Sequence, residues 1–424
     1  MSSLVRGFSG RAFGSGVLAL LLAAGCDTGE HLEPCNIATE TCQEDIYYAL
    51  VRLRGDGFDP LAGLPPIDTI PVETYRAQLQ AAADAREAAQ AMHPPPEEPD
   101  EDEPKPVVPW DFALQVLGLV TPTTSSGQAS VDNQVANVAA FYSSATRSVT
   151  VIDRGQARDD FFDTGLLLHE LTHALQDREL SGAFSDGTTD GDLASRALTE
   201  GEATFYQHLS HVEMRGESPE DIDWHLGYTQ NLQGGRGGLP EDRSPYYGVR
   251  WFIYPLGARF LSDAWERGGN AGVRHAYATQ PRHIAQFMTP HDEADADLRS
   301  VLDPALLCDV QTPGEGWERP GLDRFGALIV YSFFVGAEIP DDEAWPLASG
   351  WDDDLIYVFF EPEDELVLVT WRIRLADEAA AQRAVELMVL DPRVHATAEG
   401  RDVVLIAGND EDTTADWDGA LDCD

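Results

Sequence analysis

The chain has 424 residues, of which 43% are hydrophobic, and its 74 acidic residues against 28 basic ones give a formal net charge of −46. A chain of this length is long for a single compact core, so we expect two or three folded units. A surface with so much negative charge repels nucleic acid and anionic lipid headgroups, which argues against both as ligands.

The N-terminus carries a short apolar run, VLALLLAA, at residues 17–24. A membrane-spanning helix needs about 20 apolar residues, so this run is typical of a secretory signal. Residues 22–26 (LAAGC) resemble a bacterial lipobox, which implies cleavage before Cys26 and acylation of that cysteine. We therefore predict a lipoprotein signal peptide at 1–25 and an exported cell-envelope lipoprotein, periplasmic or on the outer surface, attached to the membrane only through its lipid. An ordinary signal peptide with an incidental cysteine is the alternative.

Four further cysteines, Cys35, Cys42, Cys308 and Cys423, form an even set. In an oxidising compartment such a set favours disulfides. Of the three possible pairings we favour Cys35 with Cys42, which are close in sequence, and Cys308 with Cys423, which share the C-terminal segment. The spacing lacks the paired CxxC of a structural zinc site, so disulfides or free thiols are expected.

Residues 26–109 are predicted to be an accessory segment. Residues 44–54 and 72–92 have the composition and spacing of helices. Residues 93–109 are rich in proline and acidic residues, which oppose helix formation and repel one another, so they predict an extended linker.

Residues 110–303 are predicted to form the main domain, with a β-hairpin first and helices after it. The hairpin spans 137–155, where AAFY and SVTVI flank a polar turn. Helices are then expected across the motif HELTH, over 193–214, and over 251–269, where glycines end the last one.

Residues 304–424 are predicted to form a small separate α+β domain. Strand-like runs at 355–360 and 365–373 are followed by a helix at 376–388 and a strand at 402–408. Together with the main domain, this ββαβ pattern predicts an α+β protein overall.

Residues 166–177 read LLLHELTHALQD and contain the pattern HExxH, formed by His169, Glu170 and His173. Residues four apart on a helix lie nearly above one another, so both imidazoles can bind one ion. Glu170 lies about 100° around the helix, where it can reach an ion-bound water without being a ligand. The leucines and alanines fall on the other side of the helical wheel, which argues against ordinary core histidines.

A catalytic zinc ion typically has three protein ligands, so two histidines are not enough. The sequence LTEGEATFYQHL at 198–209 offers Glu200 and Glu202. Glu200 lies opposite the apolar face of its predicted helix, as the histidines do on theirs, and is favoured over Glu202. The alternative for this segment is a solvated acidic helix face. The pattern predicts one zinc ion per chain.

HELTH followed by EGEA resembles the gluzincin metallopeptidases, the thermolysin-like group with an EGxA third-ligand motif. The resemblance implies a zincin-like metallopeptidase domain in which His169, His173 and Glu200 bind zinc and Glu170 activates water. The segment AFYSSATRSVTVI resembles the strand that borders the cleft of such enzymes. The resemblance covers about residues 137–210.

The sequence departs from this family at a residue that supports the zinc ligands. Thermolysin-like enzymes carry an aspartate one turn after the third ligand, where this chain has Thr204. A group that orients a histidine must therefore come from elsewhere, and Asp177 and Gln207 are candidates.

The family also uses a histidine or tyrosine to stabilise the transition state. Tyr247, Tyr254 and His225 are candidates for this role. A tyrosine on an amphipathic stretch more often serves packing, which is the alternative for each tyrosine.

The predicted function is zinc-dependent hydrolysis of peptide bonds, with a protein or peptide as substrate. Two alternatives stay open: a noncatalytic, zinc-stabilised envelope scaffold or binding lipoprotein, and a metal-dependent amidase acting on cell-wall material. Glu170 is not expected to be a ligand, and a purely structural site has no use for it. This favours an enzyme.

Overall fold

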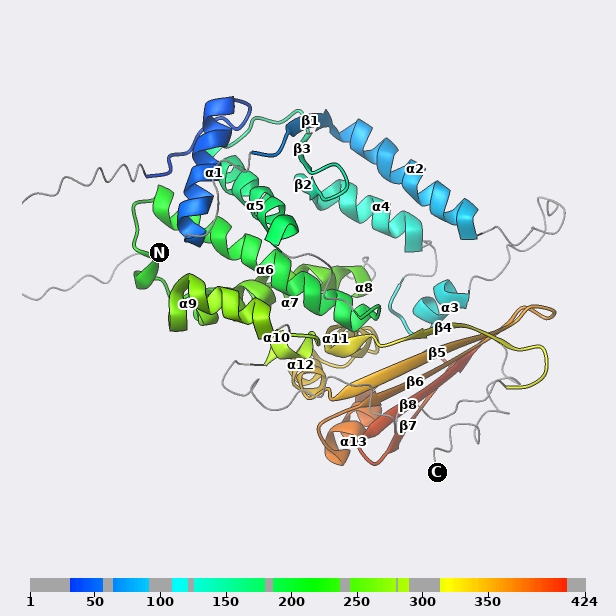
Figure 1. Ribbon diagram of the computed structural model, residues 1–424. Coiled ribbons are helices and arrows are strands. Elements are labelled where there is room, and N and C mark those ends of the chain that lie inside the picture. Colours follow the sequence, from blue (N-terminus) through cyan, green and yellow to red (C-terminus); the bar gives the residue numbers. More distant parts are fainter. Residues whose placement is uncertain are drawn as a thin grey trace, which may run out of the picture. The chain divides into compact units, whose positions relative to one another are not determined.

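The structure is a computed structural model, and it describes eight stretches of the chain (Figure 1). Residues 32–424 belong to one compact unit and residues 1–31 to another. The predicted signal peptide with Cys26, the linker up to residue 108, and Cys308 and Cys423 lie outside the described residues. The described residues are 31–55, 64–90, 109–120, 126–179, 186–236, 245–279, 281–289 and 313–409.

The first half of the chain combines helices with a three-stranded sheet in the order β1-β3-β2. Strand β3 pairs in parallel with β1 and antiparallel with β2, so the predicted hairpin is confirmed and β2 forms one edge of this sheet. The parallel strand β1 was not predicted. The elements are α1 (Glu40–Arg54), β1 (Ile67–Pro71), α2 (Val72–Gln90), α3 (Pro109–Val116), α4 (Ser126–Asn137), β2 (Ala140–Ser143) and β3 (Ser148–Asp153).

A group of helices follows, and Figure 1 shows α6 lying between α5 and α9. The predicted helix over 251–269 corresponds to the end of η3 and the first part of α9, whose path breaks at Gly268 and Gly269 and then continues to Thr279. The elements are α5 (Asp160–Glu179), α6 (Thr189–Met214), η2 (Pro219–Asp221), α7 (Trp224–Arg236), α8 (Pro245–Gly248), η3 (Val249–Phe252), α9 (Ile253–Thr279) and α10 (Ala285–Met288).

Two glycines allow α6 and α9 to cross in direct backbone contact. A Cβ atom added at Gly201 would lie 2.3 Å from the carbonyl carbon of Gly257, and one added at Gly257 would lie 1.7 Å from the carbonyl oxygen of Ala197. These distances leave no room for a side chain at either position. Because Gly201 directly follows Glu200 in the chain, this crossing helps to position that carboxylate.

The C-terminal part contains an antiparallel sheet in the order β4-β5-β6-β8-β7. It includes the predicted ββαβ pattern and adds β4, whose sequence contains proline and glycine, and the half-exposed edge strand β7. Helix α11, apolar along its length, is almost completely buried. The elements are β4 (Glu318–Asp323), α11 (Gly326–Gly336), α12 (Asp341–Ser349), β5 (Asp353–Glu361), β6 (Leu366–Arg374), α13 (Glu378–Leu387), β7 (Val394–Glu399) and β8 (Asp402–Gly408).

The hydrophobic core crosses the predicted domain boundary at residue 304. One cluster of buried side chains contains Leu198 and Leu256 from the helices together with Phe333 and Trp371 from the C-terminal part. The fold is therefore mixed α+β, with its C-terminal sheet packed on the same core as the helices.

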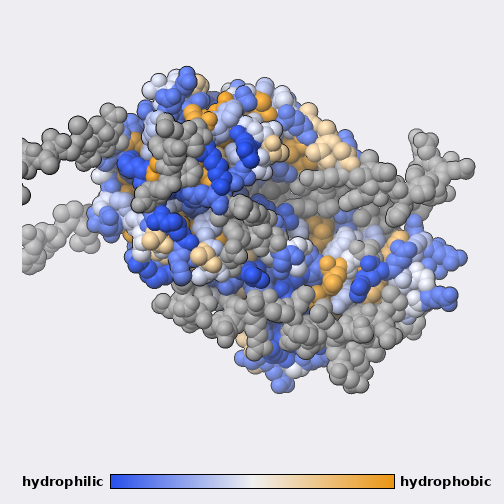
Figure 2. Space-filling model, in the orientation of Figure 1, coloured by the Kyte–Doolittle hydropathy of each residue, from blue (hydrophilic) through white to orange (hydrophobic). Residues whose placement is uncertain are grey.

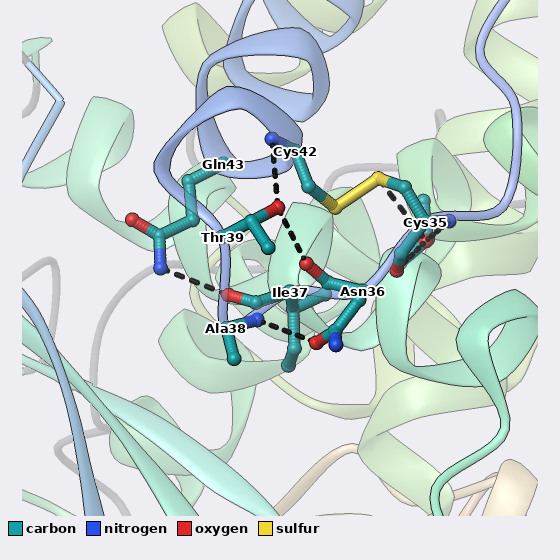
Figure 3. Close-up of a disulfide and its surroundings, with 8 residues drawn as sticks. Cys35, Asn36, Ile37, Ala38, Thr39, Cys42 and Gln43 are labelled. Carbon is teal, nitrogen blue, oxygen red and sulfur yellow. Dashed lines mark hydrogen bonds between the residues drawn. A yellow bond between two sulfur atoms is a disulfide. The ribbon is translucent and has the colours of Figure 1, made fainter.

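A disulfide links Cys35 to Cys42, with a Cα–Cα distance of 5.7 Å, and this is the pairing that the sequence favoured (Figure 3). Thr39 caps α1 by accepting a hydrogen bond from the backbone N–H of Cys42. The backbone N–H of Cys35 donates to Oγ1 of Thr164 on α5, at 3.1 Å. The disulfide loop therefore attaches the start of α1 to the helix that carries the HExxH motif.

On the face drawn in Figure 2, hydrophilic residues predominate and hydrophobic residues gather in small groups. This agrees with the high content of charged residues. Among the helices that the structure describes, none is both long and apolar enough to cross a membrane.

Candidate metal centre

Helices α5 and α6 bring His169, His173 and Glu200 together. Oε2 of Glu200 lies 3.3 Å from Nε2 of His169 and 3.3 Å from Nε2 of His173, and the two Nε2 atoms are 3.2 Å apart. The three side chains form a group that could hold a metal ion. Glu202, the less favoured candidate, is not part of this group.

The dimensions of the group can be compared with those of a tetrahedral metal site. Metal–ligand bonds of about 2.0 to 2.1 Å in that geometry separate the ligand atoms by about 3.3 to 3.4 Å. The three measured separations of 3.2 to 3.3 Å come close to this value. Two imidazole nitrogens and one carboxylate oxygen also form a donor set of catalytic metal sites, in which a fourth position stays open. The residues therefore fit a metal ion.

The charges around the group favour a cation. Burial lowers the pKa of His173, but the negative charges of Glu200 and Glu170 and the hydrogen bonds that the imidazole donates to Glu200 and Gln176 more than offset this and raise it to about 9. Burial opposes the ionised form of Glu200, yet the two histidines hold its pKa well below the usual range. The negative charge that retains a proton on His173 in the metal-free protein also attracts a metal ion.

Glu170 lies beside the group without joining it. It is only 5% exposed. Its Oε2 accepts a hydrogen bond from the backbone N–H of Tyr142 at 2.8 Å. Because Tyr142 belongs to β2, this strand borders the centre. The phenol of Tyr142 donates to Asp177 on α5, at 3.0 Å, and thereby attaches the strand to the helix that carries the motif.

Gln176 orients His173, a role that sequence reasoning missed. Its Oε1 lies 2.8 Å from Nδ1 of His173. The expected supports, Asp177 and Gln207, do not take this place. The available signal was position, because Gln176 stands three residues after His173 on the same helical face. Nδ1 of His169 is buried and has no hydrogen-bond partner within the described part of the chain.

Tyr254, on α9, lies closest to the centre among the described candidates for transition-state stabilisation. Its ring stacks on His169 with a centroid distance of 6.2 Å, and Trp251 stacks on it in turn at 5.5 Å. Burial raises the pKa of Tyr254, and the charge of Glu200 together with a hydrogen bond to it adds to this. The phenol therefore stays protonated and able to donate.

The other two candidates differ from Tyr254. His225, on α7, pairs with Asp263 at 3.1 Å rather than with His169, His173 or Glu200. The side chain of Tyr247 lies outside the described part of the structure.

Comparison of the chain with known protein families, with curated proteins and with solved structures finds no match. The metal centre and the groups around it are therefore the basis for a proposed function.

Proposed function

We propose that this protein is a zinc metallopeptidase of the gluzincin type, with a zincin-like domain, exported and lipid-anchored at Cys26. The main support is the tetrahedral spacing of His169, His173 and Glu200, with separations of 3.2 to 3.3 Å. Glu170 next to them is buried without being a ligand. A site that only stabilised the fold would gain nothing from such a carboxylate.

In this proposal His169, His173 and Glu200 hold one zinc ion. Zinc bound there would lower the pKa of a water molecule towards neutrality and polarise the scissile carbonyl group. Glu170 takes a proton from the attacking water and later delivers it to the leaving amine. The hydrogen bond from the N–H of Tyr142 to Oε2 orients this carboxylate and leaves Oε1 to receive the proton.

Tyr254 is the proposed hydrogen-bond donor of the site. Its phenol remains protonated, because burial and the charge of Glu200 raise its pKa. We assign to it the hydrogen bond that stabilises the negative charge on the substrate oxygen in the transition state.

The first experiment measures the metal content of the purified protein and its hydrolysis of casein, short peptides and peptidoglycan. We expect about one zinc per chain in the wild type and loss of that zinc in His169→Ala. Glu170→Gln should keep the metal and lose about 100-fold or more in turnover, because it removes the base alone.

Glu179→Gln is the matched control, since Glu179 lies at the end of the same helix and is exposed. It should leave both zinc content and turnover unchanged. Normal turnover in Glu170→Gln would refute the assigned base. Zinc binding without hydrolysis of any substrate would favour a scaffold, and hydrolysis of peptidoglycan alone would favour a cell-wall amidase.

A further inference from the structure

A chain of hydrogen bonds, buried at its centre and partly buried at its ends, runs from α1 through α6 to His173. Arg54 contacts Oε1 of Glu202 through Nε at 3.0 Å and Nη2 at 2.7 Å. Oε2 of Glu202 accepts a hydrogen bond from Nε2 of Gln176 at 2.8 Å, and Oε1 of Gln176 lies 2.8 Å from Nδ1 of His173. Glu202 and Gln176 are only 1% and 4% exposed, so water has little access to either.

The surroundings decide which way the amide of Gln176 points. Its Nε2 lies 2.9 Å from the backbone carbonyl oxygen of Thr199 and 2.8 Å from the carboxylate of Glu202. A carbonyl oxygen and a carboxylate accept hydrogen bonds and donate none. This end of the amide must therefore be the NH₂ group, and the carbonyl oxygen faces His173.

The orientation of the amide in turn decides where His173 carries its proton. The oxygen of Gln176 can only accept, so Nδ1 of His173 must donate. In the neutral imidazole the lone pair is then on Nε2. Nε2 is the atom that lies 3.3 Å from Glu200 and 3.2 Å from His169, where a metal ion would bind.

The ion pair with Arg54 maintains this arrangement. It places Oε1 of Glu202 2.7 Å from Nη2 of Arg54. The phenol of Tyr277 also donates to Oε2 of Glu202, at 2.6 Å. If the residue at position 202 could donate, one of the two acceptors that fix the amide would be lost, and Gln176 could more readily turn its amide over and donate to Nδ1 of His173. The proton of the imidazole would then move to Nε2 and block the metal.

We propose that Glu202, paired with Arg54, sets the tautomer of His173 through Gln176 and so tunes the affinity of the centre for zinc. Glu202 and Gln176 are positioning residues, since neither belongs to the ligand group. The inference rests on the proposed zinc centre, in which His173 is a ligand through Nε2.

The test compares Glu202→Gln and Gln176→Met in the full chain. Glu202→Gln keeps the shape of the side chain but allows it to donate, and Gln176→Met removes the acceptor while leaving the Arg54–Glu202 pair intact. The dissociation constant for zinc alone is measured by competition with a chromophoric chelator. Both variants should bind zinc about 10- to 100-fold more weakly than the wild type.

Glu179→Gln is the control, because Glu179 also pairs with Arg54, at 3.0 Å, yet its side chain is 43% exposed. It should bind zinc as the wild type does. Zinc binding by both test variants within twofold of the wild type would overturn the inference. Absence of zinc binding by the wild type would instead refute the proposed function.

A second measurement does not depend on any variant being folded. Ring ¹⁵N chemical shifts of the zinc-loaded wild-type protein report which nitrogen of His173 carries the proton. The inference requires a protonated Nδ1 and a metal-bound Nε2. The reverse assignment would overturn it whatever the variants do.

Discussion

At the scale of single residues, the centre is an arrangement of opposite charges brought into contact by two helices. In the metal-free protein, the carboxylate of Glu200 and the imidazole of His173 stabilise each other's charged forms. A metal ion would replace the proton on His173, so binding of the metal and binding of the proton compete.

The metal-free protein should lose stability as the pH rises through about 9. The pKa of His173 in the folded chain is raised from 6.5 to about 9, so the folded state holds this proton more tightly than the unfolded state. The stabilisation is therefore fully present below about pH 6.5 and lost as the pH rises from there through about 9. We expect a loss of up to about 3 kcal/mol in the free energy of unfolding, measured with urea after removal of metal.

His173→Gln provides the comparison for this titration, because it lacks the group that binds the proton. The difference in unfolding free energy between wild type and variant should be larger at pH 6 than at pH 10. A difference independent of pH over this range would contradict the assigned charge state.

Replacement of Tyr254 by phenylalanine tests its assigned role. Tyr254→Phe keeps the stacking on His169 but removes the donor. We expect kcat to fall about 100- to 1000-fold while the affinity for zinc stays the same. Tyr228→Phe is the matched control, because this buried tyrosine bonds to His208 on α6 rather than to the ligand group. Equal kcat values for the two variants would remove Tyr254 from the mechanism.

At the scale of elements, the site depends on how closely α6 approaches its neighbours. Helix α5 contributes the histidines and α6 contributes Glu200, while α9 crosses α6 at Gly201 and Gly257. A change in the distance between α6 and α9 should therefore affect the metal centre as well as the core.

Gly257→Ala should separate these two helices. The added methyl group would lie 1.7 Å from the carbonyl oxygen of Ala197, so the backbone must move. We expect a loss of about 1 to 3 kcal/mol in unfolding free energy, as for other overpacked cores, and weaker zinc binding because Glu200 lies next to the crossing. Urea unfolding and zinc competition measure the two effects.

Gly227→Ala is the control within helix α7, because a Cβ at Gly227 meets nothing within 4 Å. It should be neutral or stabilise the protein by about 0.5 to 1 kcal/mol. Unaltered zinc affinity in Gly257→Ala, despite reduced stability, would show that the crossing does not position Glu200.

At the scale of the whole molecule, Asp354 joins the C-terminal sheet to the start of the buried helix α11. This buried carboxylate at the start of β5 accepts four hydrogen bonds, from the backbone N–H groups of Phe325 and Gly326 and the indole N–H groups of Trp351 and Trp371. Because the hydrophobic core is also shared, we expect the helices and the sheet to unfold together.

Asp354→Asn should destabilise the entire unit. The side-chain amide of the asparagine would place an NH₂ group where the carboxylate now accepts hydrogen bonds. At least one buried donor would then lose its acceptor, which lowers the free energy of unfolding by about 1 to 3 kcal/mol. Far-ultraviolet circular dichroism and tryptophan fluorescence should still show one coincident transition in urea. Asp364→Asn, at an exposed position, should have no effect, and two separate transitions in Asp354→Asn would show that the sheet unfolds independently.

Patterns of short range were predictable from the sequence. Runs of apolar and β-branched residues bounded by turns indicated the β2–β3 hairpin and the strands β5, β6 and β8, and the spacing of His169 and His173 placed both on one helical face. Strands β4 and β7 were missed, because β4 contains proline and glycine and the half-exposed edge strand β7 has alanines at most of its inward positions, so neither has a run of bulky apolar residues.

The sequence by itself determined the local geometry and the candidate ligands, because helical periodicity acts over a few residues and needs no tertiary contact. Only the tertiary structure decided that Glu200 meets the histidines while Glu202 pairs with Arg54. It also decided that Gln176 holds His173 and that one core extends from the helices into the C-terminal sheet. These contacts join residues far apart in the chain, and their distances depend on how whole helices and strands pack.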